Sequence, residues 1–549
     1  MDNKINRRRM LAGVGVVAGG AAFNGLSGIV SADELDAGDY VVPVNTIDNL
    51  KSIASVVGET FMVKERCNGV FNSVLTSTVT PNGYDVVQST YNSGISYVLV
   101  VDCYNPKKFG AVANGVVNDL PVLNYVLSTY GALNLGSNVN KYAISGGSLD
   151  VGFFCVINSC GATIIQLDSN RPIVKISSSR WEISNVFLRY ASQQSALHTK
   201  SYGVIFDAAF EGVCKNIMVM KAYRGFGVNN SNVFDGSSYA YMLSLFGCRS
   251  LDHYDWGFYF SNDGSAGMTT TSLINCYAVQ GSNSNVNIFS KGFYVSNHSG
   301  GFLMLNCAAD KHQGGTVLLI QSCSNFTSTG MDVESNVIYN NSLITVSSSV
   351  NVDIAGISFV ENKFSGVSSI FKSNGQGRYI KVSGRERNST NMGTLYGVQA
   401  SSDSEQSEID AFNFISDGGF PREDNLTPNS KRQIYSYNHK VYAEKSGVGS
   451  RVEYRSSCPI SGFWSVGDII KNHSPSNINP ITEWICIIAG TPGKWRPVSS
   501  VTVKGSTEFR PALLSGDFGV TYIDTTLQQY GKPIWWNGSS WIDASGVIV

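Results

Sequence analysis

A loose repeat of about thirty residues in the middle of the chain is the feature that most constrains its fold. Four segments, 212–217, 246–251, 274–279 and 305–310, each carry one cysteine among short apolar runs. The cysteines lie 34, 28 and 31 residues apart, and aromatic–glycine segments recur between them at 224–226, 256–258 and 291–293. A period of this length with strand-sized runs predicts one supersecondary unit per repeat, stacked on its neighbours.

The cysteines indicate how such units pack. Side chains alternate inward and outward along a strand, and a free cysteine behaves as a small buried hydrophobe. We therefore expect an interior stack rather than disulfides. The predicted fold class is all-β: a right-handed parallel β-helix with a capping helix at its N-terminal end, a small N-terminal β-rich unit and small C-terminal β modules. The residues of the predicted stack are Cys214, Cys248, Cys276 and Cys307.

Composition excludes several classes of protein. Charged residues make up 15% of the 549 residues and the net charge is −1, so no global field attracts nucleic acid. A hydrophobic share of 43% argues against disorder. The chain has no C-x-x-C pair and its six histidines are scattered, so we predict no metal site and no cofactor.

The repeat region is bounded by segments of different character. Residues 41–105 alternate in short runs and predict a β-rich head. The β-helix is predicted over 106–395 and begins with a helix, because Asp119 and Pro121 suit a helix start and 122–130 carries one apolar face. A linker is predicted over 396–430, followed by a β-rich module over 431–500 and a tail module over 501–549. Six of the eight tryptophans lie in these modules, where we expect most of them to fill cores rather than to stack on sugars.

The first forty residues form a separate segment. Arg7, Arg8 and Arg9 precede an apolar stretch that ends near Phe23, and small residues follow at 30–32. This pattern resembles a twin-arginine export signal. An export leader and a retained anchor both fit the segment, and both interpretations stay open.

Three stretches resemble bacteriophage tailspike proteins of the pectin-lyase-like β-helix type. Residues 108–119 (KFGAVANGVVND) are similar to the entry motif that precedes the capping helix, with Asn114 in place of the usual aspartate. Residues 463–470, with 484–486 and 489–495, resemble a module near tailspike C-termini. The patches 510–511, 522–526 and 531–541 resemble the terminal tail of phage fibre and spike proteins. The resemblance implies a homotrimer located in the virion tail. It would bind a bacterial surface polysaccharide and be held by a phage tail or baseplate protein through its N-terminal region.

Glycoside cleavage requires a proton donor and a second carboxylate. Asp332 and Glu334 are separated by one residue in 330–335 (GMDVES), so both should face outward while Met331 and Val333 face inward. Asp310 would lie on the neighbouring rung and raise the pKa of one partner. These three are the first choice for catalysis, and Lys311 and His312 beside them are candidates for substrate binding.

A second group of polar residues lies within 249–256. It provides Asp252, His253 and Asp255 as second-choice catalytic residues, with Arg249 and Trp256 as substrate-binding candidates. The preferred function is hydrolysis of a capsule, exopolysaccharide or O-antigen during host attachment. A non-catalytic receptor-binding spike or adhesin is the alternative, and so is a lyase that acts by β-elimination with a His or Tyr base. An exported protein that modifies cell-surface polysaccharide is a third possibility.

Overall fold

The computed structural model divides the chain between Ala191 and Ser192 into two compact units. The described residues are 41–228, 239–261, 268–281, 290–313, 315–374, 378–391, 394–400, 409–416, 423–425, 433–437, 440–444, 450–460, 464–472, 481–498, 503–513 and 520–549. The proposed leader at 1–40 lies outside them.

The first unit begins with a small sheet, which confirms the predicted β-rich head. A short helix, α2 (Ile47–Lys51), follows its first strand. The sheet has the order β1–β2–β3–β5–β4, in which only the β1–β2 pair is parallel. Its strands are β1 (Val41–Val44), β2 (Thr60–Val63), β3 (Gly69–Leu75), β4 (Val86–Gln88) and β5 (Ile95–Leu99).

The predicted helix is α3 (Leu120–Tyr130), and its buried face includes Leu123 and Val126. Asp119 stands at its N-cap position, but its carboxylate accepts hydrogen bonds from Val112 N and Ala113 N instead of capping the helix. The prediction of the helix is thus confirmed, while Asp119 ties down the preceding loop.

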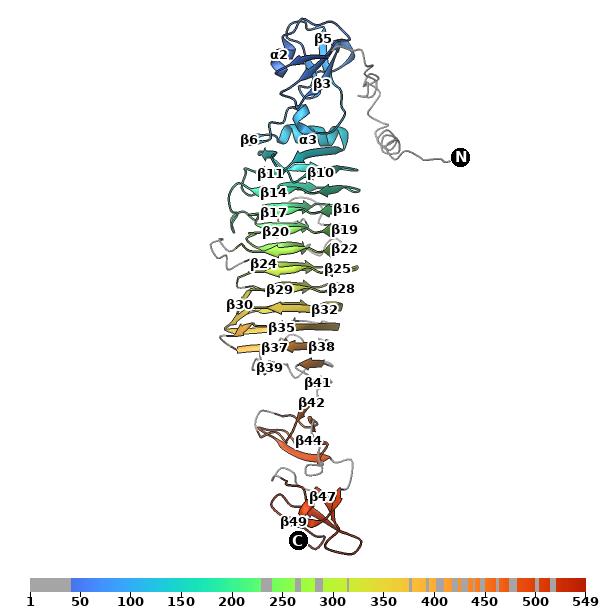
Figure 1. Ribbon diagram of the computed structural model, residues 1–549, viewed down its shortest axis with the longest axis vertical. Helices are drawn as coiled ribbons and strands as arrows, with labels where there is room; N and C mark the ends of the chain where they lie inside the picture. Colours follow the sequence, from blue (N-terminus) through green and yellow to red (C-terminus); the bar gives the residue numbers. More distant parts are fainter. Residues whose placement is uncertain are drawn as a thin grey trace, which may run out of the picture. The chain divides into compact units, whose positions relative to one another are not determined.

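Short strands on both sides of α3 pair in parallel: β6 precedes the helix and the others follow it. β10 pairs with β7 and β13, and β11 pairs with β8 and β14. These strands form coils, each coil being one turn of a parallel β-helix (Figure 1). They are β6 (Asn114–Asn118), β7 (Ala132–Ser137), β8 (Lys141–Ile144), β9 (Leu149–Val151), β10 (Val156–Cys160), β11 (Thr163–Gln166), β12 (Val174–Ile176), β13 (Glu182–Ser184) and β14 (Phe187–Tyr190).

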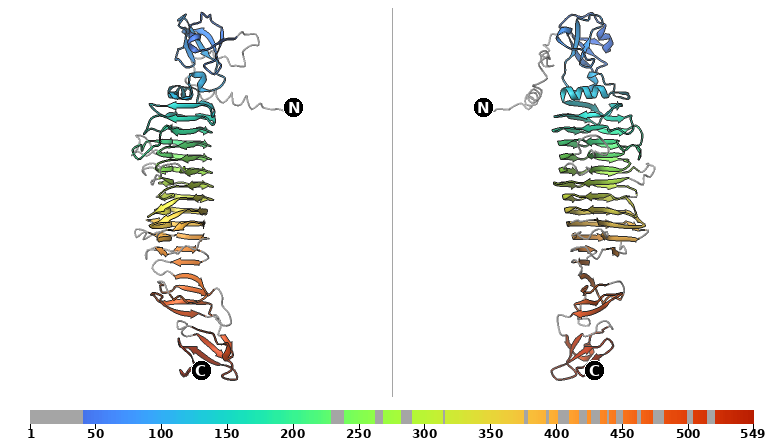
Figure 2. Two further views of the ribbon diagram at one scale, coloured as in Figure 1. Left: turned by 60° about the vertical axis from the view of Figure 1, so that its left-hand side comes forward. Right: turned by 180° about the vertical axis from the view of Figure 1, so that it is seen from behind.

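The second unit contains stacked parallel coils with three principal ladders of strands (Figure 2). The predicted right-handed parallel β-helix is confirmed. The first ladder is β16 (Ala209–Lys215), β19 (Ala240–Phe246), β22 (Met268–Ile274), β25 (Phe302–Leu305), β28 (Ser324–Thr329), β32 (Val350–Val360), β35 (Arg378–Arg387) and β38 (Ile409–Ser416). The second ladder is β17 (Met218–Met220), β20 (Arg249–Leu251), β23 (Tyr277–Val279), β26 (Ala308–Asp310) and β29 (Asp332–Glu334), after which it joins the far half of β32.

The third ladder runs along another side of the coils. It is made of β15 (Tyr202–Phe206), β18 (Arg224–Val228), β21 (Trp256–Ser261), β24 (Lys291–Ser296), β27 (Leu318–Gln321), β31 (Ser342–Ser347), β34 (Val367–Asn374), β37 (Thr394–Ala400) and β39 (Glu423–Asn425). A smaller ladder contains β30 (Val337–Tyr339), β33 (Lys363–Ser365) and β36 (Thr390–Asn391). The described parts of the predicted linker 396–430 are strands of these ladders, since β38 pairs with β35 and β39 with β37. Composition marks a connection there but does not tell whether another coil follows it.

The cysteines are free and most are buried, as predicted, but their alignment differs in one place. Cys248, Cys276 and Cys307 follow one another in a single interior column, since Tyr277 N donates to Cys248 O and Ala308 N to Cys276 O. Ile217 occupies the corresponding position in the preceding coil, because Arg249 N donates to its carbonyl. Cys214 pairs in register with Leu245 and belongs to a neighbouring interior column.

Two glycines narrow the interior between the second and third ladders. A Cβ on Gly257 would lie 2.6 Å from the Ala278 Cβ, and one on Gly292 would lie 3.1 Å from the Ala309 Cβ. The two walls therefore approach closely, and only small side chains fit between them.

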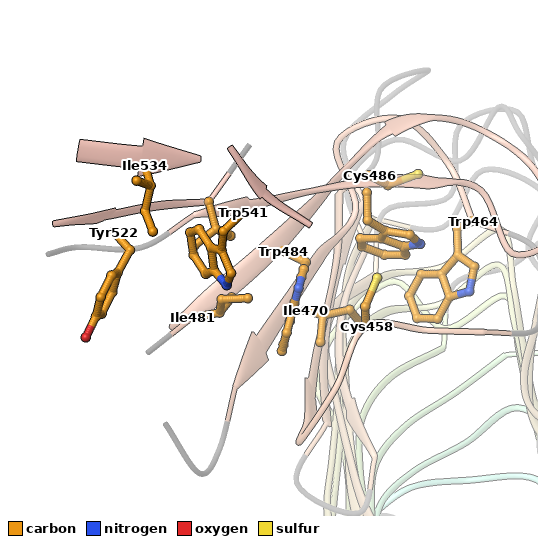
Figure 3. Close-up of a cluster of buried hydrophobic side chains, with 11 residues drawn as sticks. Cys458, Trp464, Ile470, Ile481, Trp484, Cys486, Tyr522, Ile534 and Trp541 are labelled. Carbon is orange, nitrogen blue, oxygen red and sulfur yellow. The ribbon is translucent and has the colours of Figure 1, made fainter. Parts of the chain in front are cut away.

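The C-terminal strands form small β modules. These strands are β40 (Gln433–Tyr437), β41 (Lys440–Glu444), β42 (Ser450–Arg455), β43 (Ile469–Asn472), β44 (Glu483–Ile488), β45 (Lys494–Val498), β46 (Val503–Gly505), β47 (Thr521–Asp524), β48 (Lys532–Trp536) and β49 (Trp541–Ile542). One apolar cluster includes residues of both predicted modules, such as Ile481 and Trp541 (Figure 3). Trp464, Trp484 and Trp495 are also buried in it, as predicted for most of the tryptophans.

Buried histidines make the stability of the fold sensitive to acid. Burial lowers the pKa of His253 and of His298 to about 4, against about 6.5 in an unfolded chain. Both rings are neutral in the fold: Nε2 of His253 donates to Lys291 O at 2.9 Å, and Nδ1 of His298 donates to Gly300 O at 2.7 Å.

We expect stability to be full above pH 6.5 and to fall as the pH drops toward 4, because the unfolded chain binds protons that the fold excludes. Across this pH range, each ring should lower the free energy of unfolding by on the order of 3 kcal/mol. Thermal melting from pH 8 to pH 4 measures the effect. The doubly substituted chain His253→Asn/His298→Asn should show a shallower fall, and an equally steep fall would contradict the assignment.

Candidate functional site

The outer face of the second ladder carries the predicted carboxylate pair. Asp332 and Glu334 are exposed at the two ends of β29, and Val333 between them is fully buried. Met331 is buried as well. The inward–outward alternation predicted for this segment is therefore confirmed, and both acids face solvent from one strand.

Asp310 lies beside this pair on the preceding coil. It is the register partner of Glu334 in the β26–β29 pairing, so the two backbones are about 4.8 Å apart. Asp310 is 7% exposed, and its Oδ2 accepts a hydrogen bond of 2.7 Å from Tyr277 Oη. Lys311 Nζ lies 3.6 Å from the same oxygen, while the buried Oδ1 has no hydrogen-bond partner. We call Asp310, Asp332 and Glu334 the acid cluster.

The acid cluster shifts the titration of its members and neighbours. The pKa of Glu334 is raised, first by partial desolvation and then by the negative charges of Asp310 and Asp332. Lys311 opposes this shift. Burial and the hydrogen bond to Asp310 also raise the pKa of Tyr277, so its phenol remains a proton donor to Asp310 near neutral pH.

The geometry suits acid–base chemistry on a bound chain. Asp332 and Glu334 are two residues apart on one strand, about 6.6 Å at the backbone, and Asp310 adds a third carboxylate across the ladder. A carboxyl group with a raised pKa can hold a proton for a leaving oxygen, while an ionised neighbour acts as base or nucleophile. The cluster thus supplies both groups that glycoside cleavage needs.

The predicted polar residues of 249–256 are divided among four environments. Arg249 is exposed on the outer face of β20, in the same column as Tyr277 and Asp332. Asp252 follows at a turn, where its Oδ1 accepts from Gly281 N at 2.6 Å. Of the predicted polar residues, only Arg249 therefore shares a column with the acid cluster.

His253 and His312 lie in the interior and do not reach a polymer on the outer face. They are 1% and 0% exposed, and their rings pack with centroids 5.1 Å apart. Burial lowers the pKa of both, so they are neutral. The sequence predicts a catalytic role for His253 and a substrate-binding role for His312, because both lie beside polar residues. Each follows a turn that directs its ring into the interior instead. We therefore assign neither to the site.

Asp255 and Trp256 belong to the third ladder. Asp255 Oδ2 accepts from Arg224 Nε at 2.8 Å, and its Oδ1 lies 3.5 Å from Lys291 Nζ. Trp256 is 5% exposed, with Lys291 Nζ 4.9 Å from its ring centre. Both carboxylate oxygens of Asp255 interact with cations, and the indole of Trp256 is buried. The two residues therefore form part of a packed ion network and do not offer a surface for a sugar ring to stack on.

Sequence reasoning missed a pocket beside the acid cluster. Its volume is about 320 Å³, and its lining includes Ser358, Arg385 and Arg387. Ser358 is the register partner of Asp332 on one side and of Arg385 on the other. The sequence signal was the pattern Arg-x-Arg on a strand, which becomes informative only once the register between coils is known.

The described residues were also compared with the patterns of a metal site and of a membrane-spanning helix. Among them, no group of three or more His, Cys, Asp or Glu side chains is arranged to hold a metal ion. A helix long and apolar enough to cross a membrane is not found in the described part of the chain. The absence of a cofactor and of a metal stays a prediction.

Searches with the sequence found no relatives: no protein-family model matches, and neither does any curated protein. Solved structures do match. The gp42 tailspike of Acinetobacter phage vb_AbaP_AS12 superposes with a TM-score of 0.52 at 14% identity, over 84% of this chain and 94% of that one.

Two further matches are weaker. The A-module of the Azotobacter vinelandii mannuronan C-5 epimerase AlgE6 has a TM-score of 0.40 at 14% identity, over 60% of this chain and 97% of that one. The enzymatically active domain of tailspike protein 4 of bacteriophage CBA120 has a TM-score of 0.42 at 14% identity, over 71% of this chain and 55% of that one.

The fold defines the chain as a parallel β-helix protein. Within that class its architecture is like that of a phage tailspike, which confirms at the level of the fold the resemblance inferred from sequence.

Proposed function

We propose that this chain is a tailspike-type enzyme that binds and hydrolyses a bacterial surface polysaccharide during attachment of a phage to its host. Glu334 donates the proton to the leaving oxygen, and Asp332 acts as base or nucleophile. Partial desolvation and the negative charge of Asp310 both raise the pKa of Glu334, and Asp310 is itself held by Tyr277. The observation that carries the proposal is an exposed carboxyl with a raised pKa, flanked by two further carboxylates on one solvent-facing strand ladder.

Hydrolysis is favoured over β-elimination at this site. The elimination considered above needs a His or Tyr base close to the sugar. His253 and His312 are buried, and the phenol of Tyr277 is committed as a donor to Asp310. The carboxylates of the acid cluster serve hydrolysis directly.

We expect Glu334→Gln and Asp332→Asn each to lower the cleavage rate by at least about a hundredfold, because each removes a proton-transfer group. Both side chains are exposed, so polymer binding and melting temperature should stay near those of the unaltered chain. Reducing-end release from capsule, exopolysaccharide and O-antigen preparations measures cleavage.

Lys381→Ala is a matched control, since Lys381 is exposed on the neighbouring ladder away from the cluster. Binding without any chain shortening by the unaltered protein would favour a non-catalytic receptor-binding spike. Release of unsaturated sugar ends would instead indicate a lyase.

The charge of Asp310 should raise the upper pH limit of activity. Glu334 acts in its protonated form, so activity falls as the pH rises through its pKa. Asp310→Asn removes a like charge that raises this pKa. We therefore expect the alkaline limb of the kcat/KM profile to move to lower pH. An unchanged limb would show that Asp310 does not act on the proton donor.

We also propose that three copies of the chain associate and that the trimer is held in a virion tail by a tail or baseplate protein through its N-terminal region. An outward apolar strip on the first ladder supports the contact between copies. It consists of half-exposed side chains on β19, β22 and β25: Phe246, Ile274, Leu303 and Leu305.

Sedimentation of the purified chain should give a mass three times that of one copy. Phe246→Asp together with Leu305→Asp should shift the mass toward a single copy, because each places a charge in the apolar contact. A trimer that withstands both substitutions would place the contact elsewhere.

A further inference from the structure

A small pocket with a cationic rim lies beside the acid cluster. Its floor contains Gly356, Gly384, Ser358 and Ser383, and the guanidinium side chains of Arg385 and Arg387 line it. The volume of about 320 Å³ falls at the lower end of the range for small-molecule pockets. It is therefore sized for one small polar group rather than for a long segment of polymer.

The backbone creates the hollow. β32 contains an irregularity between Ile354 and Ile357, where Gly356 has a φ of +65° and its N–H donates to Ser383 Oγ at 3.3 Å. On the next strand, a Cβ at Gly384 would lie 2.8 Å from Ile357 O. Gly356 thus leaves the outer face of β32 without a side chain at this irregularity, and the floor is polar backbone and serine. Gly384 instead turns its missing Cβ toward the buried Ile357 and Phe359, so it lets the two backbones approach closely.

The position of the two arginines links the pocket to the acid cluster. Arg385 and Arg387 are exposed at alternate positions of β35, so they project from the same face. Arg385 pairs in register with Ser358, which pairs with Asp332, while Arg387 pairs with Val360, which pairs with Glu334. The arginines therefore stand two rungs, roughly 10 Å, from the proposed catalytic acids.

We propose that this pocket binds the carboxylate of an acidic sugar in the polysaccharide, next to the bond that the acid cluster cleaves. Arginine presents a planar fork of donors that matches a carboxylate, and two such groups on one face favour an anion. The serine floor provides hydroxyls for the sugar ring. This inference rests on the proposed function, since it names the substrate class for the same face.

Binding of monosaccharides tests the pocket without turnover. Sodium glucuronate, glucose 6-phosphate and glucose are titrated into the full chain and followed by saturation-transfer NMR. We expect glucuronate to bind at least about tenfold more tightly than glucose, and Arg385→Ala with Arg387→Ala to abolish the difference. Arg385→Lys should bind glucuronate less tightly than the unaltered chain, because lysine lacks the fork.

The control is Lys381→Ala, which removes an exposed cation from the same strand outside the pocket and should leave glucuronate affinity unchanged. Equal affinity for glucose and glucuronate would overturn the proposal. Preference for glucose 6-phosphate would overturn the assignment to a carboxylate, and an equal loss in Lys381→Ala would show a diffuse charge effect only. Cleavage is not measured here, so an inactive acid cluster would not alter the result.

Discussion

In-register pairing of parallel coils is the constraint on which the second unit depends. Asp332 N donates to Cys307 O and Ser358 N to Met331 O, each at 2.9 Å, so every residue of these strands has a fixed neighbour one coil away. Side chains are thereby sorted into columns, with thiols and aliphatics inside and charged groups outside. The acid cluster, Tyr277 and the arginine-lined pocket all occupy such outer columns.

Much of this architecture could be predicted because period and alternation are local properties of sequence. The repeat predicts the stacked coils, and the apolar face of 122–130 predicts the helix α3. The pairing register between successive coils was harder to predict from the sequence. Residue type groups Cys214 with Cys248, yet Cys214 pairs with Leu245, because the spacing between repeats varies with the length of the turns. The composition of 396–430 predicts a linker, whereas its strands β38 and β39 pair within the ladders.

The orientation of site residues could be predicted where they lie on one strand. It could not be predicted where the chain turns from one ladder to the next. Asp332 and Glu334 follow the simple alternation of β29. Residues 249–256 instead pass from an outer face through a turn to another ladder, so Arg249, His253 and Asp255 face three different surroundings. The pocket could not be predicted from the sequence, because Ser358 and Arg385 become neighbours only through pairing between coils.

The narrow interior behind the acids has a consequence for how such a site can change. Since Ala309 packs close to Gly292, the wall cannot yield inward, and carboxylates can occupy only positions that the strand lattice offers. Neighbouring positions differ by about 4.8 Å across strands or about 6.6 Å along one. Reaction stereochemistry, which depends on carboxyl separation, would then evolve in discrete jumps as an acid moves from one lattice point to the next, rather than by gradual drift.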